Sequence, residues 1–304
     1  MKLPSRHIFL GYMAGIVGGV TYGMNPLFAK PLMSNGVSVP TMLFFRYFIA
    51  ALIMLIIMMC RHESRHVSRR QLPVMILLGV LYALSSILLF ESYAYIPCGL
   101  ATTMIYLYPV FSALLLIATG HYPSWQTLCS ILLSLIGVSL MTFSVHGESL
   151  SLLGIILTAL SALCYASYLV IIHLSKRTSA FTADAITYYG MFIGTVMFFF
   201  YHLIKGGNML DGVMEKNSII NLLGLSVFPT IIAMFTVAFS TRTIGASKTG
   251  VLGVFEPLSA ILIGALVFHE SLSWNIYLGI AVSVFAVLFM IAGTYFNRYK
   301  PQIV

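Results

Sequence analysis

Apolar residues run along this chain in long stretches, and short segments that carry charge, glycine, proline or asparagine separate one stretch from the next. Most stretches reach the length of about 20 residues that a helix needs to cross a hydrocarbon core of about 30 Å. Lipid offers the backbone no hydrogen-bond partners, so each stretch must be helical. The pattern predicts ten transmembrane helices, with limits near 8–29, 41–60, 73–94, 98–119, 126–145, 151–173, 183–204, 218–240, 246–268 and 274–295.

The composition predicts an integral membrane protein of the all-α class. Of the 304 residues, 60% are hydrophobic and only 8% are charged, whereas soluble proteins carry charge on about a quarter of their residues. The formal net charge of +8 does not indicate a nucleic-acid partner, because the cations are distributed along short loops. The four cysteines lie within or beside apolar runs without the spacing of metal ligands, so we expect no metal and no cofactor.

The positions of lysine and arginine predict the orientation of the chain. If the first residue is cytoplasmic, the outer loops hold three cations, Lys30, Lys205 and Lys216. The inner side then holds eleven, namely Lys2, Arg6, Arg61, Arg65, Arg69, Arg70, Lys176, Arg177, Arg242, Arg298 and Lys300. Such a bias in short loops places both termini in the cytoplasm. The short loops also favour a multi-pass protein of a bacterial inner membrane.

The chain contains a weak internal repeat. At a spacing of 148 residues Ser92 matches Ser240 and Pro109 matches Pro257, and at 149 Trp125 matches Trp274. We therefore predict two halves of five helices each, residues 1–145 and 146–304. Because five is odd, the second half enters the membrane in the opposite orientation. Inverted repeats of this kind are an architecture of secondary transporters, with the substrate site near the midplane between the halves.

Three stretches resemble a known family: "FFRYFIAAL" in the second span, "YPVFSALL" in the fourth and "FEPLSAILIGALVFHESLS" in the ninth. Together with the repeat, they resemble the EamA-like branch of the drug/metabolite transporter superfamily. The resemblance implies movement of small metabolites and includes exporters of amino acids, nucleobases or drugs. Glu256, Pro257 and Glu270 match the motif of the ninth span, and Arg46 matches an arginine frequent in the second span. The first half departs from the pattern, because Tyr108 and Tyr122 stand where an acid often stands, and Tyr22 replaces a tryptophan.

Depth in the membrane singles out Glu256 among the ionisable residues. It lies about ten residues into the ninth span, roughly 15 Å along a helix, and so near the midplane. Arg46 and Lys248 lie closer to span ends, from which their head groups can extend to the interface. We therefore expect Glu256 to be the only deep charge. One interpretation makes it a proton-coupling carboxyl or a partner for a substrate amine, and the other a structural acid that bonds backbone groups freed by Pro257.

Polar and aromatic residues at similar depth are candidates for the substrate cavity. These candidates are Tyr22, Asn25, Ser86, Thr103, Tyr106, Tyr165, Tyr168 and Glu256. The alternative for each tyrosine is packing, and for each hydroxyl a bond to its own backbone or to a neighbouring helix. Pro109 and Pro257 occupy equivalent positions in the two halves, where we expect helix kinks that border a cavity or act as hinges.

These features predict a secondary transporter that works by alternating access, with spans one, three, four, six, eight and nine around the cavity. No cluster of lysine or arginine is expected at the midplane, which favours an amino acid, an aromatic metabolite or an amphiphilic drug over a phosphorylated substrate. Export and proton coupling fit this hypothesis, with the chain a monomer or homodimer. The alternatives are a membrane scaffold or sensor and, less favoured, a membrane-embedded enzyme, since "HES" at 269–271 lacks the second histidine of a zinc-protease motif.

Overall fold

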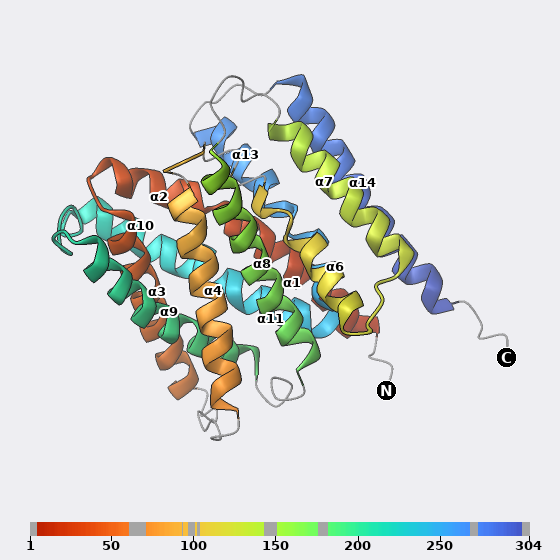
Figure 1. Cartoon of the computed structure of the whole chain (residues 1–304), viewed down its shortest axis with the longest axis horizontal. Helices are drawn as coiled ribbons and strands as arrows, with labels where there is room; N and C mark the ends of the chain where they lie inside the picture. Colours follow the sequence, from red (N-terminus) through yellow and green to blue (C-terminus); the bar gives the residue numbers. More distant parts are fainter. Residues whose placement is uncertain are drawn as a thin grey trace.

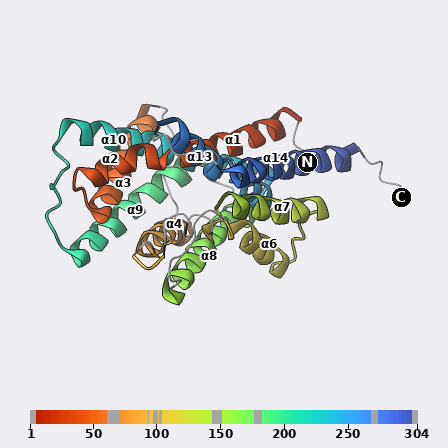
Figure 2. The ribbon, with the colours of Figure 1, turned by 90° about the horizontal axis from the view of Figure 1, so that it is seen from above.

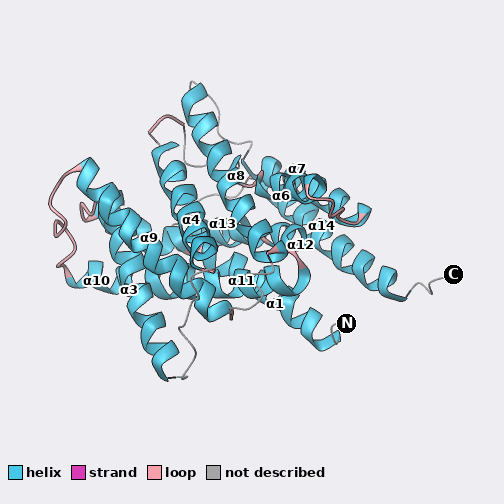
Figure 3. Ribbon diagram, turned by 60° about the horizontal axis from the view of Figure 1, so that its bottom comes forward, coloured by secondary structure: helices cyan, strands magenta, loops and turns pink. Residues whose placement is uncertain are grey.

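The computed structural model describes residues 5–60, 71–92, 94–96, 101, 104–142, 151–175, 182–267 and 273–299. Within these ranges every regular element is a helix, as Figure 3 shows. Seven of these helical stretches are long and apolar enough to cross a membrane: 39–60, 72–92, 152–174, 183–205, 216–244, 246–267 and 274–293. Two further apolar helices, covering 108–118 and 125–140, are shorter. The described part of the chain therefore has the all-α architecture expected from its apolar stretches.

The helices of the described residues follow one another along the chain in two groups. The earlier ones are α1 (Ser5–Gly23), α2 (Asn25–Ser34), α3 (Val39–Cys60), α4 (Leu72–Ser92), α6 (Tyr108–Ala118) and α7 (Trp125–Thr142). The later ones are α8 (Leu152–Leu174), α9 (Ala183–Lys205), α10 (Lys216–Ser226), the π-helix η1 (Val227–Ile232), α11 (Ala233–Ile244), α12 (Ala246–Leu252), α13 (Phe255–Val267) and α14 (Trp274–Tyr299).

The first predicted span, 8–29, is not one continuous helix. α1 ends at Gly23, Met24 forms a turn, and α2 begins at Asn25 with Pro26 in its first turn. Proline has no backbone N–H and so begins a helix more readily than it continues one. The Asn25 side chain holds the turn by donating a hydrogen bond from Nδ2 to the Tyr22 carbonyl at 2.9 Å. The first predicted span therefore consists of two helices joined by a turn.

Turns also precede the two symmetry-related prolines. Tyr106 and Leu107 form a turn before α6, whose second residue is Pro109. Gly253 and Val254 form a turn before α13, whose third residue is Pro257. Each proline therefore lies in the first turn of a new helix, where its missing N–H breaks no intrahelical bond. The break between α12 and α13 leaves backbone carbonyls of α12 available to the side chains of Tyr106 and Tyr108.

A π-helix interrupts the segment from α10 to α11. It spans Val227–Ile232 and contains Pro229, whose ring is accommodated by the wider turn. Thr230 Oγ1 donates a hydrogen bond to the Leu225 carbonyl, five residues earlier, at 2.8 Å. π-Helical turns occur frequently at functional sites because they expose carbonyl groups inside a helix.

The most extensive helix contacts join elements that are far apart in the sequence. They pair α7 with α14, α3 with α9, α4 with α8, and α1 with α11. Figures 1 and 2 show α7 and α14 running side by side at one edge of the molecule. The start of α1 and the end of α14 lie toward the same end in both views. In the predicted repeat, α1 would correspond to α8 and α4 would correspond to α11. The contact of α1 with α11 would then be equivalent to the contact of α8 with α4.

Candidate functional site

A cavity of ≈ 200 Å³ lies between the helices of the two predicted halves. We call it the central cavity. Its aromatic lining consists of Tyr22, Tyr47, Tyr82, Phe90, Tyr108 and Tyr165, and its polar lining of Asn25, Arg46, Ser85, Ser86 and Glu256. These residues come from α1, α2, α3, α4, α6, α8 and α13. The second span, through α3, contributes to this cavity, whereas the expected set of spans omitted it.

Tyrosine rings form most of the aromatic wall. The hydroxyls of Tyr22 and Tyr82 share a hydrogen bond of 2.5 Å, which links α1 to α4. The Tyr165 ring lies edge-on to Tyr108, with centroids 4.8 Å apart, and also contacts Tyr82 at 6.1 Å. Edge-to-face contacts fix the orientation of each ring. They leave part of the ring surface facing the cavity. The wall can therefore offer aromatic faces to a planar ligand.

Arg46 lies inside the protein and does not reach the membrane interface. It is only 6% exposed, and its guanidinium donates three hydrogen bonds. Nε donates to Thr230 Oγ1 at 2.5 Å, Nη1 to Asn25 Oδ1 at 2.9 Å and Nη2 to the Pro229 carbonyl at 2.7 Å. Two of these acceptors belong to the π-helix. The expectation that its head group extends to the interface was wrong, because a folded partner helix supplies acceptors that lipid lacks.

Glu256 is the second residue of α13 and also lines the central cavity. Among the described residues, none donates a hydrogen bond to its carboxylate. The positive charge of Arg46 acts on this carboxylate across the cavity. Glu256 is therefore not the only deep charge, since Arg46 lines the same space. The cavity places one anion and one cation among tyrosine rings, which is an arrangement that suits a ligand carrying both charges.

The predicted site residues divide into three groups. Those that line the central cavity are Tyr22, Asn25, Ser86, Tyr165, Glu256 and Pro257. Tyr106 and Tyr168 are buried outside the lining, and Tyr168 stacks on Tyr165 with centroids 6.1 Å apart. Thr103 and Glu270 lie outside the described residues.

Sequence reasoning missed Tyr47 and Tyr82 as cavity residues. A usable signal exists for Tyr82, because Tyr82, Ser85 and Ser86 recur at the helical spacing i, i+3, i+4 and therefore share one face of α4. Tyr47 has no such signal. It follows Arg46 directly in the chain, and residues adjacent in a helix point in directions about 100° apart.

Beside the central cavity, α6 contacts α12. Tyr106 Oη donates hydrogen bonds to the carbonyls of Gly250 at 3.3 Å and Val251 at 3.0 Å. Tyr108 Oη donates to the same Gly250 carbonyl at 3.2 Å. Gly253 allows this approach, because a Cβ at that position would collide with the Tyr108 hydroxyl. The carbonyls exposed by the break between α12 and α13 thus anchor two tyrosines of the other half.

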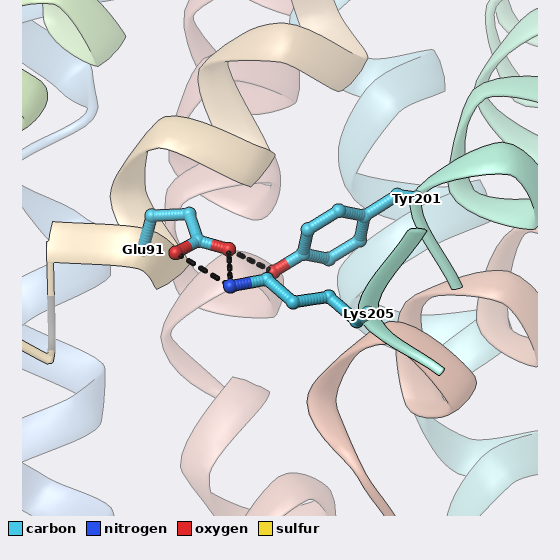
Figure 4. A network of polar contacts seen from close by, with 3 residues as sticks. All are labelled: Glu91, Tyr201 and Lys205. Atoms are coloured by element: carbon cyan, nitrogen blue, oxygen red, sulfur yellow. Dashed lines mark hydrogen bonds and ion pairs between the residues drawn. The ribbon is translucent and has the colours of Figure 1, made fainter. Parts of the chain in front are cut away.

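A polar network ties the end of α4 to α9 (Figure 4). Glu91 Oε1 accepts a hydrogen bond from Tyr201 Oη at 2.6 Å. Lys205 Nζ lies 2.7 Å from Oε1 and 3.0 Å from Oε2 of the same carboxylate. Lys205 is 48% exposed and Glu91 25% exposed, so water screens the ion pair. The network joins the last turn of a cavity-lining helix to its neighbour.

Comparisons with known proteins agree with this architecture. The sequence model of the EamA-like transporter family matches residues 9–143 and again residues 152–292. An uncharacterized transporter of Bacillus subtilis is 27% identical over 299 residues, covering 94% of this chain and 89% of that protein. An uncharacterized transporter of Archaeoglobus fulgidus is 27% identical over 191 residues, covering 62% of this chain and 66% of that protein.

A solved structure supports the same fold. It superposes with a TM-score of 0.81 at 15% sequence identity and covers 95% of this chain and 98% of that chain. At this identity the likeness concerns the fold alone. The family match covers most of the chain, and the apolar helices have the length that a membrane crossing requires. The chain is a multi-pass membrane protein that belongs to the EamA-like transporter family.

Proposed function

We propose that this protein is a secondary transporter that carries a small zwitterionic metabolite, such as an amino acid with an aromatic side chain, by alternating access. The observation that carries the proposal is the pairing of Glu256 and Arg46 in one tyrosine-lined cavity. A carboxylate can bind a substrate ammonium, and a guanidinium can bind a substrate carboxylate. Three of the five N–H groups of Arg46 are engaged by described residues, which leaves two for a ligand.

The volume of the cavity supports a small substrate over an amphiphilic drug. Pockets that bind drug-sized ligands usually enclose about 300–1,000 Å³. The central cavity encloses ≈ 200 Å³, which is below this range. Its polar groups are also few and placed at different walls, so that they orient a ligand by its charged ends while the tyrosines cover its apolar part.

The contacts between helices support alternating access by two inverted halves. The family model matches twice, and the α4–α8 and α1–α11 contacts are the pair that an inverted repeat would make equivalent. The α6–α12 contact closes the cavity at the end that the charge bias predicts to be cytoplasmic. In this proposal both termini are cytoplasmic, the membrane is the bacterial inner membrane, and transport is export. Opening toward the cytoplasm would require Tyr106 and Tyr108 to leave the α12 carbonyls.

Glu256 is the group to which a proton gradient would couple in this mechanism. Its carboxylate lines the cavity without a described hydrogen-bond donor, so that a substrate ammonium or a proton can neutralise it in turn. Arg46 is anchored by three acceptors, which hold its guanidinium in place at the cavity wall. Competition between proton and substrate for one carboxylate would couple the two movements.

Two measurements test the proposal. Binding is measured as the melting temperature of the purified protein, and transport is measured after its reconstitution in liposomes. We expect phenylalanine or tyrosine to raise the melting temperature, because a ligand of the folded state stabilises it. Glu256→Gln should weaken this binding and remove the pH dependence of transport. Glu215→Gln, at an exposed position beside α10, is the matched control. A response confined to phosphorylated compounds would refute the substrate class, and unchanged pH dependence in Glu256→Gln would refute the role of the carboxylate.

A further inference from the structure

A second cavity, of ≈ 560 Å³, lies at the end of the molecule where α6, α8 and α11 terminate and α12 begins. We call it the basic cavity, after His121, His173 and Lys248, which line it. It shares no lining residue with the central cavity. None of its described lining residues is acidic. The charge bias of the loops predicts that this end faces the cytoplasm.

Three basic side chains converge on this cavity from separate elements. His121 follows α6, His173 lies in the last turn of α8, and Lys248 lies in α12. His173 is within electrostatic range of both His121 and Lys248. His121 Nδ1 donates a hydrogen bond to the Thr119 carbonyl at 3.0 Å, which fixes the orientation of its ring. No acidic side chain among the described residues of the lining competes with an anion for these groups.

The wall also contains an unsatisfied donor. Ser247 is 5% exposed, and its Oγ has no hydrogen-bond partner among the described residues. Burial of a hydroxyl without a hydrogen-bond partner is unfavourable, so such a group is a candidate to bind a ligand. Ser247 precedes Lys248 directly in α12 and lines the same cavity. A hydroxyl and an ammonium side by side are suited to one oxyanion.

The position of the cavity is compatible with ligands from water and from lipid. Tyr122 lines it and is 78% exposed, and the neighbouring Trp125 is 63% exposed. Exposed tyrosine and tryptophan at helix ends are typical of the membrane–water interface. Basic pockets between helices at the cytoplasmic interface are suited to anionic head groups. The same chemistry would accept a free phosphate.

We propose that the basic cavity is an oxyanion-binding site that takes a phosphate group through Lys248 and Ser247, with His121 and His173 lining the same space. The phosphate belongs either to a free anion or to the head group of an anionic lipid. This site is separate from the one that holds the transported substrate, and its occupancy is measured by binding. A failure of the transport proposal would therefore leave it standing, and the reverse is also true.

The experiment measures the stability of full-length protein, purified and freed of lipid in a neutral detergent. One arm titrates inorganic phosphate against chloride at constant ionic strength, and the other adds phosphatidylglycerol against phosphatidylcholine. Lys248→Gln is the main variant, and Lys216→Gln, at an exposed position on α10, is the control. Ser247→Ala is the second variant, because removing an unpaired buried hydroxyl does not destabilise the ligand-free fold.

A rise in melting temperature with phosphate supports the site as one for free oxyanions. A rise with phosphatidylglycerol alone supports a lipid head group. In either case we expect Lys248→Gln to weaken the affinity at least about tenfold and Ser247→Ala to weaken it about two- to tenfold. Lys216→Gln should match the wild type. The proposal is overturned if neither ligand stabilises the wild-type protein, or if both cavity variants respond as Lys216→Gln does.

Discussion

Replacing Gly253 with alanine adds a methyl group where α6 and α12 meet. A Cβ at this position would lie 2.9 Å from Tyr108 Cζ and 3.0 Å from the Gly250 carbonyl oxygen, and closer still to Tyr108 Oη. The backbone of Gly253 has φ −58° and ψ −14°, which alanine adopts without strain. The cost of the substitution is therefore steric, and its magnitude reports how closely Tyr108 approaches α12.

The expected loss follows from three contributions to the free energy of unfolding. Overpacking a close contact costs about 1–3 kcal/mol. Displacing Tyr108 loses its hydrogen bond to the Gly250 carbonyl, which contributes about 0.5–1.5 kcal/mol. Against these, alanine restricts the unfolded chain and stabilises by about 0.4–1 kcal/mol. The net result is a destabilisation of about 2 kcal/mol.

The assay is reversible unfolding in mixed micelles, with Gly190→Ala as the matched control. Gly190 lies inside α9, where an added Cβ would meet only the flexible end of Met234, at 3.2 Å. We expect that variant to be as stable as the wild type or slightly more stable. In a Tyr108→Phe background, which lacks the colliding oxygen, the cost of Gly253→Ala should fall by about 1 kcal/mol.

Two results would contradict this reasoning. One is a Gly253→Ala variant as stable as Gly190→Ala. The other is strict additivity of Gly253→Ala and Tyr108→Phe, because residues in contact must show coupling. Either result would mean that Tyr108 does not pack on α12, and the proposed closure of the central cavity at this end would lose its support.

Three further predictions concern the polar groups around the cavity. Arg46→Lys should lower the free energy of unfolding by about 2–4 kcal/mol, because an ammonium cannot satisfy three acceptors in the geometry of a guanidinium. A variant with wild-type stability would contradict the buried network. Tyr82→Phe and Tyr22→Phe should each cost about 1 kcal/mol and the double variant less than their sum, because both remove one shared hydrogen bond; additive losses would contradict it. Glu91→Gln should lower the free energy of unfolding by less than about 1 kcal/mol, because water screens the partly exposed ion pair with Lys205. Added salt should reduce the difference in stability between the variant and the wild type. A difference that does not change with salt would contradict this explanation.

Much of the architecture follows from the sequence alone. The length and spacing of apolar runs require helices, because lipid cannot satisfy a backbone that is not hydrogen-bonded internally. The motifs around Arg46, Pro109 and Glu256 carry the family resemblance, and the family match over 9–143 and 152–292 confirms it. These signals are local or periodic. They survive in a single sequence because the membrane imposes them on each segment separately.

Some of the residues that the sequence offered as cavity candidates line the central cavity and others pack beside it, and the sequence could not separate the two groups. Tyr165 lines the central cavity while Tyr168, three residues later, packs behind it. Both lie on overlapping faces of α8, and an apolar helix surrounded by other helices offers no polar face by which to orient it. The direction in which each tyrosine points depends on the rings that neighbouring helices bring against it.

For Arg46, the sequence by itself determined the depth in the span but not the partners of the side chain. Hydropathy set its distance from the end of the span, and that distance permits either extension to the interface or burial. Its acceptors are Asn25, at the break between two helices, and Pro229 and Thr230, which are 183 and 184 residues away in a π-helix. An apolar run of the same length is compatible with a straight helix, a broken helix or a π-helix. Only the packed structure decides among these, because the hydrogen bonds that favour burial of the charge exist only after distant helices have come together.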